Sequence, residues 1–341
     1  MIGVLYSLQS NVFSSVLSLK PGKKFTFWLK TAVFAGLLIY IGYVLQQQPF
    51  DWTLVREQIT AVEHPEQWAA GLFLLTPVNW GFEALKWQIL LQRIEKSTYW
   101  QAYKGVLAGV ALGFALPALL GDTAGRVLSL RTHRAEAVGA SLVSGGMQFY
   151  VALVFGAVAW AHHITVVPIR NNIAGQWLLV ILVALSAGGI VFGLTRQRLV
   201  RWLEKRPGLR RFTDYWNVAG LYSDREIAQA LGVAALRYVV FSVQFYLVMR
   251  LVGIHLSAGL SASSIGLVFL VKTITPAFNL LSDLGVREAA SLWVFEPFSQ
   301  TNDTVSTSVL LTATLTLWVA NVLTPVLVGL IWVWKLKLTT E

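Results

Sequence analysis

The fold is decided by an apolar stretch at residues 105–121, GVLAGVALGFALPALLG. An apolar run is normally read as a helix that crosses a bilayer, which takes about 20 residues. Here basic residues flank the run on both sides, with Lys104 before it and Arg126 after it. Because Lys and Arg collect in cytoplasmic loops, both ends are expected on the same side of the membrane. We therefore predict a re-entrant hairpin that enters the membrane and returns, with its break at Pro117.

A second stretch has the mirror-image problem, at residues 263–298, SSIGLVFLVKTITPAFNLLSDLGVREAASLWVFEPF. It lies between an outward end near Arg250 and an outward start near Asp303. A hairpin that enters from outside and breaks near Pro276 fits both ends. The alternative is that both stretches are ordinary crossing helices in which Pro and Gly serve packing. Non-helical backbone at membrane depth is tolerated only inside protein or beside a water-filled cavity, so two hairpins predict a polar interior.

The composition of the whole chain predicts an integral membrane protein. Its 341 residues are 55% hydrophobic and 13% charged, against about 25% charged in soluble domains. A chain of this size cannot enclose so much apolar surface by itself, which excludes a soluble enzyme, and the same composition excludes a disordered chain. Without cysteine, disulfide frameworks, thiolate metal sites and cysteine nucleophiles are also excluded. We expect the net charge of +10 to face anionic lipid headgroups and not nucleic acid.

The remaining apolar runs predict the spans and their orientation. With the N-terminus in the cytoplasm, most Lys and Arg fall inside, whereas the first outer loop is acidic. Both termini are therefore expected in the cytoplasm. We expect a cytoplasmic amphipathic segment at 1–26, a single membrane domain at 27–334 and a cytoplasmic tail at 335–341. The fold prediction is an all-α polytopic membrane protein with two re-entrant hairpins and six full transmembrane helices, near 27–46, 67–91, 137–160, 176–195, 229–252 and 307–334.

The two predicted hairpins share a short charged pattern. Asp122 precedes Arg126 by four residues, and Asp283 precedes Arg287 by four residues. Four residues make about one helical turn, so an Asp near the start of a helix could pair with the Arg one turn on. Hairpins that enter from opposite faces are what an inverted repeat would produce, and transporter sites commonly form where such broken helices meet. The alternative is an ion pair in solvent that caps a helix outside the membrane.

These residues resemble the lysylphosphatidylglycerol synthase transmembrane-region family, also described as flippase-like. Larger members of that family carry a soluble aminoacyl-tRNA-dependent transferase domain after the membrane part. Because this sequence ends at Glu341, the resemblance implies a stand-alone member without the transferase chemistry. It further implies a role in lipid translocation, and we expect the cytoplasmic membrane of a prokaryote. The matching stretches are LPALLGDTAGRVLSLRTH at 116–133, SLVSGGMQFYVALVFGAVA at 141–159 and TPAFNLLSDLGVREA at 275–289.

Ionisable residues at membrane depth cost about 2.5–3.5 kcal/mol each on insertion scales, so each is a candidate functional residue. Glu83 is expected to line the interior, paired with Lys86 or Arg126. Lys86 and Arg237 lie near inner ends of spans, where a long side chain can reach the headgroups. Lys272 lies within the second hairpin and needs a carboxylate or a phosphate as its partner. Four uncharged polar residues are expected to join helices by hydrogen bonds: Asn79, Gln148, Gln244 and Asn321.

The predicted function is flipping or scrambling of a phospholipid or lipid-linked headgroup. Arginine can hold a phosphate with two parallel hydrogen bonds. The alternatives are a secondary transporter of a small anion, a membrane-embedded transferase acting on a lipid carrier, and an accessory subunit without its own activity. We expect no catalytic motif, metal or cofactor, and we expect anionic membrane lipids and a separate lipid-modifying enzyme as partners. The predicted substrate-binding residues are Glu83, Asp122, Arg126, Lys272, Asp283, Arg287 and Glu288, with the arginines on the phosphate.

Overall fold

The computed structural model contains only helices in the part of the chain that it describes, which confirms the all-α prediction. The predicted segment 1–26, the predicted span 27–46 and the tail 335–341 lie outside that part, as do Pro117 and Pro276. The described residues are 52–116, 118–130, 132–167, 172–206, 213–275, 280–299 and 305–334.

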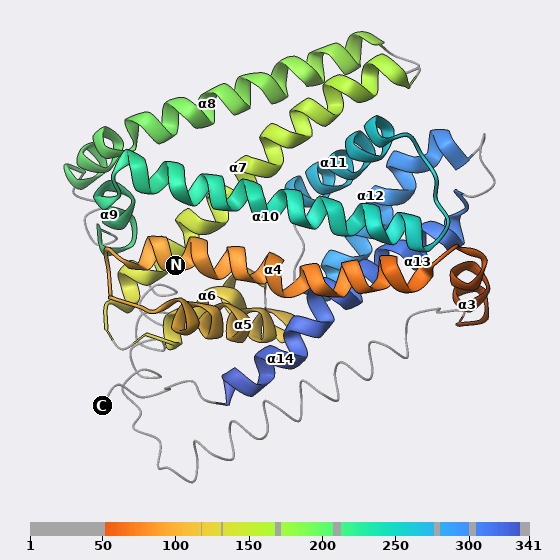
Figure 1. Cartoon of the computed structure of the whole chain (residues 1–341). Coiled ribbons are helices and arrows are strands. Elements are labelled where there is room, and N and C mark those ends of the chain that lie inside the picture. Colours follow the sequence, from red (N-terminus) through yellow and green to blue (C-terminus); the bar gives the residue numbers. More distant parts are fainter. Residues whose placement is uncertain are drawn as a thin grey trace, which may run out of the picture.

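The helices follow one another along the chain with short connections (Figure 1). They are α3 (Trp52–Ala61), α4 (Pro65–Leu91), α5 (Tyr99–Ala115), α6 (Ala118–Leu128), α7 (Arg134–Val166), α8 (Asn172–Glu204), α9 (Thr213–Leu221), α10 (Asp224–Leu251), α11 (Ala258–Ile274), α12 (Leu280–Ser299), α13 (Thr307–Trp318), the π turn η2 (Val319–Leu323) and α14 (Thr324–Val333).

Four stretches of helix in the described ranges are long and apolar enough to cross a bilayer. They are Arg134–Val166, Ile173–Glu204, Asp224–Leu251 and Thr307–Val333, the last formed by α13, η2 and α14 together. The predicted runs at 137–160, 176–195, 229–252 and 307–334 coincide with these stretches. Helix α4 has 27 residues and so has spanning length as well, with charged side chains inside it.

Helices α4 and α10 lie side by side and run antiparallel (Figure 1). At one end, Arg93, just after α4, donates to Glu226 in the first turn of α10 at 2.8 Å. At the other end, the guanidinium of Arg250 in the last turn of α10 lies over the ring of Trp68 in the first turn of α4. This pair brings side chains of both helices to the middle of the molecule.

Helices α5 and α6 form the first hairpin, held by close contact between glycines. A Cβ at Gly125 would collide with the backbone of Gly109, and one at Gly121 with the backbone of Gly113. Small residues at this spacing allow two helix backbones to approach closely within a membrane. The hairpin runs from Tyr99 to Leu128 and is longer than the predicted 105–121. The helices continue past the apolar run because Thr98 caps α5 and the returning helix includes the paired Asp122 and Arg126.

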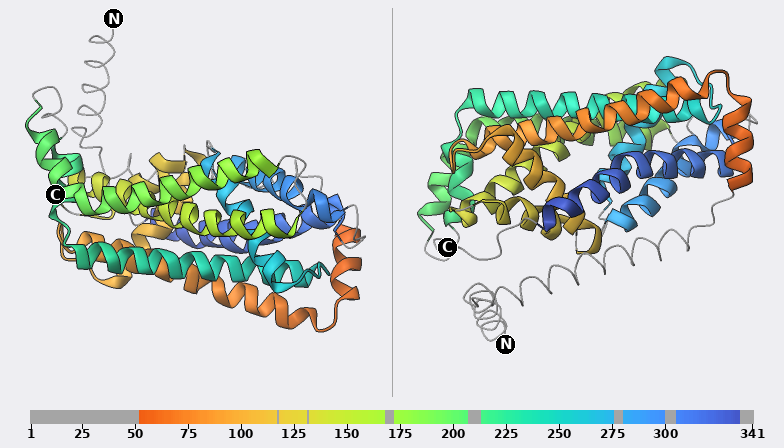
Figure 2. Two further views of the ribbon diagram at one scale, coloured as in Figure 1. Left: turned by 90° about the horizontal axis from the view of Figure 1, so that it is seen from above. Right: turned by 60° about the horizontal axis from the view of Figure 1, so that its bottom comes forward.

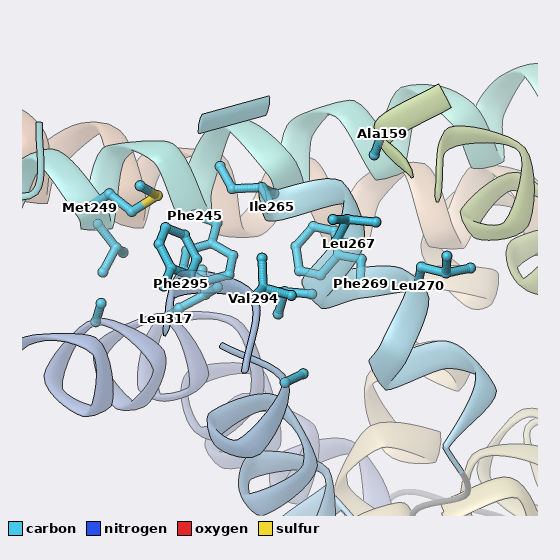
Figure 3. Packing of buried hydrophobic residues seen from close by; sticks show 14 of the residues in the cluster. Ala159, Phe245, Met249, Ile265, Leu267, Phe269, Leu270, Val294, Phe295 and Leu317 are labelled. Carbon is cyan, nitrogen blue, oxygen red and sulfur yellow. The ribbon is translucent and has the colours of Figure 1, made fainter. Parts of the chain in front are cut away.

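Helices α11 and α12 form the second hairpin. Every residue from 263 to 270 in α11 is buried, as expected for a helix that is surrounded by protein on all sides. Figure 3 shows Phe269 of α11 in the same buried cluster as Phe245 and Met249 of α10 and Phe295 of α12. The ring centroids of Phe245 and Phe269 lie 5.9 Å apart. This packing fixes the hairpin against α10.

The two hairpins enter the bundle from opposite ends (Figures 1 and 2). The first begins and ends beside the end of α4 and the start of α7, and the second begins beside the end of α10 and ends before the start of α13. Phe114, near the turn of the first hairpin, and Leu284, near the turn of the second, belong to one buried cluster with Trp318. The end of α5 and the start of α12 therefore meet inside the molecule.

Candidate functional site

Glu83 is the centre of a first buried group of charges. Its Oε2 lies 2.9 Å from Lys86 Nζ and 3.1 Å from Arg237 Nη1, and its Oε1 lies 2.9 Å from Arg126 Nη2. These cations come from α4, α10 and α6, so three elements meet at one carboxylate. The Glu83 side chain is 4% exposed. The expectation that it pairs with Lys86 or Arg126 is confirmed, because it pairs with both.

Arg126 joins the first hairpin to this group. Its Nε donates to Asp122 Oδ1 at 3.0 Å, one helical turn earlier in α6, which confirms the predicted pair. Its guanidinium also lies over the ring of Trp87, with 5.3 Å to the centroid. The Nη1 atom of Arg126 is buried and donates to no acceptor in the described ranges. The hairpin therefore presents a fixed guanidinium that retains free hydrogen-bonding capacity.

Arg237 belongs to the site, and the interpretation that it reaches out to the headgroups is wrong. It pairs with Glu83, donates to Gln148 Oε1 at 3.2 Å and lies over the ring of Trp80. Lys86 likewise turns inward, donating to the Ser144 carbonyl at 3.2 Å. A depth estimate could have identified Arg237, because 13 residues of helix place it about 20 Å beyond the start of α10.

The second hairpin carries its own buried group. Asp283 of α12 accepts from Lys272 of α11 at 2.9 Å and from Arg287 of α12 at 2.9 Å. The predicted one-turn pair is thus present, and Lys272 has the carboxylate that it needed. The Arg287 side chain is 1% exposed and its guanidinium lies over the ring of Phe241. Nε and Nη1 of Arg287 are buried and have no acceptor among the residues that the structure describes.

Helix α10 connects the two charged groups. Arg237 pairs within the first group, and Phe241, one turn later, contacts Arg287 of the second. Of the predicted site residues, only Glu288 stays apart: it is half-buried and forms no ion pair with a described residue. We refer to the six remaining predicted residues, together with Lys86 and Arg237, as the charged interior: Glu83, Lys86, Asp122, Arg126, Arg237, Lys272, Asp283 and Arg287.

Uncharged polar residues join the helices around the charged interior, as predicted. Asn79 donates to Asn321 Oδ1 at 3.1 Å, and Gln244 donates to the Leu72 carbonyl at 3.0 Å. The Trp80 indole donates to the Asn321 carbonyl at 3.0 Å, within the π turn η2. Pro325, four residues on, has no N–H to offer that carbonyl, so the indole replaces it. Trp80 thus contacts both the π turn before α14, through its N–H, and Arg237, through its ring.

The charged interior offers cations and carboxylates but no cluster typical of a metal site. Within the described residues, no three His, Asp or Glu side chains come together as they would around a metal ion. Its guanidinium groups lie against aromatic rings and its carboxylates lie against cations. Such an arrangement can hold an anion between fixed hydrogen-bond donors.

Long apolar helices around two hairpins and a buried set of ion pairs define a multi-pass membrane protein with a charged interior. The chain belongs to the family described as the lysylphosphatidylglycerol synthase TM region, whose family model matches residues 27–324 and so covers most of the chain. Membership in this family fits a lipid-related role in the membrane. A search of curated proteins found no match.

Proposed function

We propose that the protein moves the phosphate-bearing headgroup of a lipid between the two leaflets of the cytoplasmic membrane of a prokaryote. One observation carries this proposal: the charged interior holds more cations than carboxylates. Buried charge without a partner is unfavourable, so an excess of cations favours an anion beside them. The cations are Lys86, Arg126, Arg237, Lys272 and Arg287, and the carboxylates are Glu83, Asp122 and Asp283.

The proposed topology has six full spans, two re-entrant hairpins and both termini in the cytoplasm. In this topology α5 and α6 enter from the cytoplasm, whereas α11 and α12 enter from outside, as in an inverted repeat. Arg126 would then bind a phosphate that arrives from the inner leaflet, and Arg287 would bind one that arrives from the outer leaflet. A phosphate that passes between them would be held by both guanidinium groups at the middle of the membrane. No energy source is needed for scrambling, and a coupled ion would add direction.

Apolar side chains at the hairpin turns favour a lipid over a small soluble anion. Leu119 and Leu120 near the start of α6 are 59% and 63% exposed, and Ile274 at the end of α11 is 57% exposed. Exposed leucine and isoleucine beside a charged interior suit acyl chains that stay in the bilayer while the headgroup crosses. A soluble anion would instead need a path closed to lipid.

The surroundings of Glu83 also favour transport over catalysis. A transferase would need a carboxylate that is free to take a proton from a substrate. Glu83, the candidate base, accepts from three cations and is almost completely buried. Opposite charges at this distance stabilise its ionised form, so it is a poor proton acceptor. We therefore propose that Glu83 positions the cations and does not act as a base.

The test is movement of a headgroup-labelled anionic lipid in liposomes that contain the full chain. We expect Arg126→Gln and Arg287→Gln each to lower the rate by about tenfold or more, because each loses a phosphate contact worth about 1.5–3 kcal/mol. Arg201→Gln is the matched control, since Arg201 is an exposed arginine outside the charged interior. Arg126→Lys keeps the charge and separates loss of folding from loss of the unused guanidinium donor. Unchanged lipid movement in both Gln variants would refute the proposal, and uptake of phosphate without lipid movement would support a soluble-anion transporter.

A further inference from the structure

The charge excess of the interior is divided evenly between its two groups. In the first, Lys86, Arg126 and Arg237 face Glu83 and Asp122. In the second, Lys272 and Arg287 face Asp283. Each group therefore has one more cation than carboxylate among the described residues, and the pair of groups has two more.

Most of these cations carry a permanent charge. Arginine stays charged at any physiological pH, and three of the five cations are arginines. The other two, Lys86 and Lys272, each form an ion pair with a carboxylate at 2.9 Å. The two surplus charges consequently call for negative charge from a ligand or from solvent.

A single ligand can face both groups. Arg237 and Phe241 are one turn apart on α10, which separates them by about 5–6 Å along the helix. The guanidinium of Arg287 lies 5.2 Å from the centroid of the Phe241 ring. The second charged group therefore lies next to the first along α10.

The unused hydrogen-bond donors also outnumber the two terminal oxygens of one phosphodiester. Arg126 Nη1, Arg237 Nε and both Nε and Nη1 of Arg287 are buried without an acceptor among the described side chains and backbone. A phosphodiester offers two terminal oxygens and one negative charge. A phosphomonoester offers three terminal oxygens and about −1.5 to −2 charges near pH 7, and a diphosphate offers more of both.

We infer that the transported headgroup carries about two negative charges on phosphate, as in a lipid phosphomonoester or a lipid diphosphate. A phosphodiester headgroup would leave one surplus cation, and an aminoacylated headgroup with its own positive charge would leave more. The inference rests on the proposed lipid translocation and specifies its substrate class. Arg126 and Arg237 bind one side of the phosphate group, and Arg287 and Lys272 bind the other.

The experiment compares three lipids with identical acyl chains in liposomes that contain the full chain: phosphatidic acid, phosphatidylglycerol and lysylphosphatidylglycerol. We expect phosphatidic acid to move at least about tenfold faster than phosphatidylglycerol, and the cationic lipid to be slowest. Equal rates, or a faster phosphodiester, would overturn the inference and leave the proposed translocation intact. If none of the lipids moves, the proposed function itself fails. Uptake of inorganic phosphate or pyrophosphate without lipid movement would overturn the lipid source.

A charge-removing variant tests the same inference inside one protein. Lys272→Gln takes one cation from the second group while the pair between Arg287 and Asp283 remains. We expect the ratio of phosphatidic acid to phosphatidylglycerol rates to fall at least about threefold. General damage to the fold would lower both rates together and keep their ratio. Lys205→Gln, at an exposed cation, is the matched control. An unchanged ratio in Lys272→Gln would contradict the inference.

Discussion

Glu83→Gln is the most informative perturbation of the charged interior, because it removes a charge and keeps the size of the side chain. Glu83 has cationic nitrogens at 2.9, 2.9 and 3.1 Å. At an effective dielectric constant of about 20, a pair of unit charges at about 4 Å interacts by about 4 kcal/mol. The three attractions cannot be summed, since the cations also repel one another. The cost of removing one partner of a buried pair, about 3–5 kcal/mol, is the appropriate magnitude.

Thermal unfolding in detergent measures this loss. A change of about 1 kcal/mol shifts the Tm of a domain of 150–250 residues by about 2–4 °C, so we expect Glu83→Gln to lower Tm by about 6 °C or more. Adding Lys86→Met to Glu83→Gln removes an ammonium group that has lost its carboxylate. The double variant should therefore regain about half of the lost stability, as contacting residues do in a double-mutant cycle. A Tm within about 1 °C of the parent for Glu83→Gln, or strictly additive losses, would refute the electrostatic reasoning.

Three further predictions concern the hairpin and its surroundings. Gly125→Ala should abolish lipid movement and lower Tm because its Cβ collides with backbone, whereas Gly145→Ala, with open space around its Cβ, should leave both unchanged. Trp80→Phe keeps an aromatic side chain but loses the indole N–H that donates to the Asn321 carbonyl. The free energy of unfolding should therefore fall by about 1–3 kcal/mol in denaturant titration, and no change would argue against that hydrogen bond. In the naturally cysteine-free chain, Lys104→Cys and Ser129→Cys should react with an impermeant thiol reagent from the same side of the membrane, and reaction from opposite sides would rule out the first re-entrant hairpin.

Some of the site was readable from the sequence because it depends on spacing along one helix. Asp122 and Arg126 are four residues apart, and the two residues pair wherever that helix lies. The same holds for Asp283 and Arg287. Glu83 could be identified because a carboxylate within an apolar run is costly to bury without a partner. Flanking charge predicted the first hairpin, whereas the close glycine contacts between its two helices were found only in the structure.

Other parts depend on how helices rotate about their own axes, which a single sequence does not specify. Arg237 lies in the site because α10 packs against α4 with that face inward. The same sequence with α10 turned by half a rotation would place Arg237 away from Glu83. The π turn Val319–Leu323 also depends on tertiary packing, because its Asn321 carbonyl accepts a hydrogen bond from Trp80 on the distant helix α4. Such contacts arise only after tertiary packing.

The carboxylates of the charged interior have a double role that follows from their geometry. Asp122 and Asp283 each bind one edge of an arginine and leave other N–H groups of the same guanidinium without an acceptor. Because the guanidinium is a planar fork with five N–H donors, one carboxylate holds its orientation without using all of its capacity. A phosphate can therefore bind beside the carboxylate and need not displace it. In the proposed function, the aspartates would keep the arginines oriented in the absence of lipid, which would lower the entropy cost of binding a headgroup. Replacing either aspartate should for that reason weaken headgroup binding, although it removes a negative charge from a site for anions.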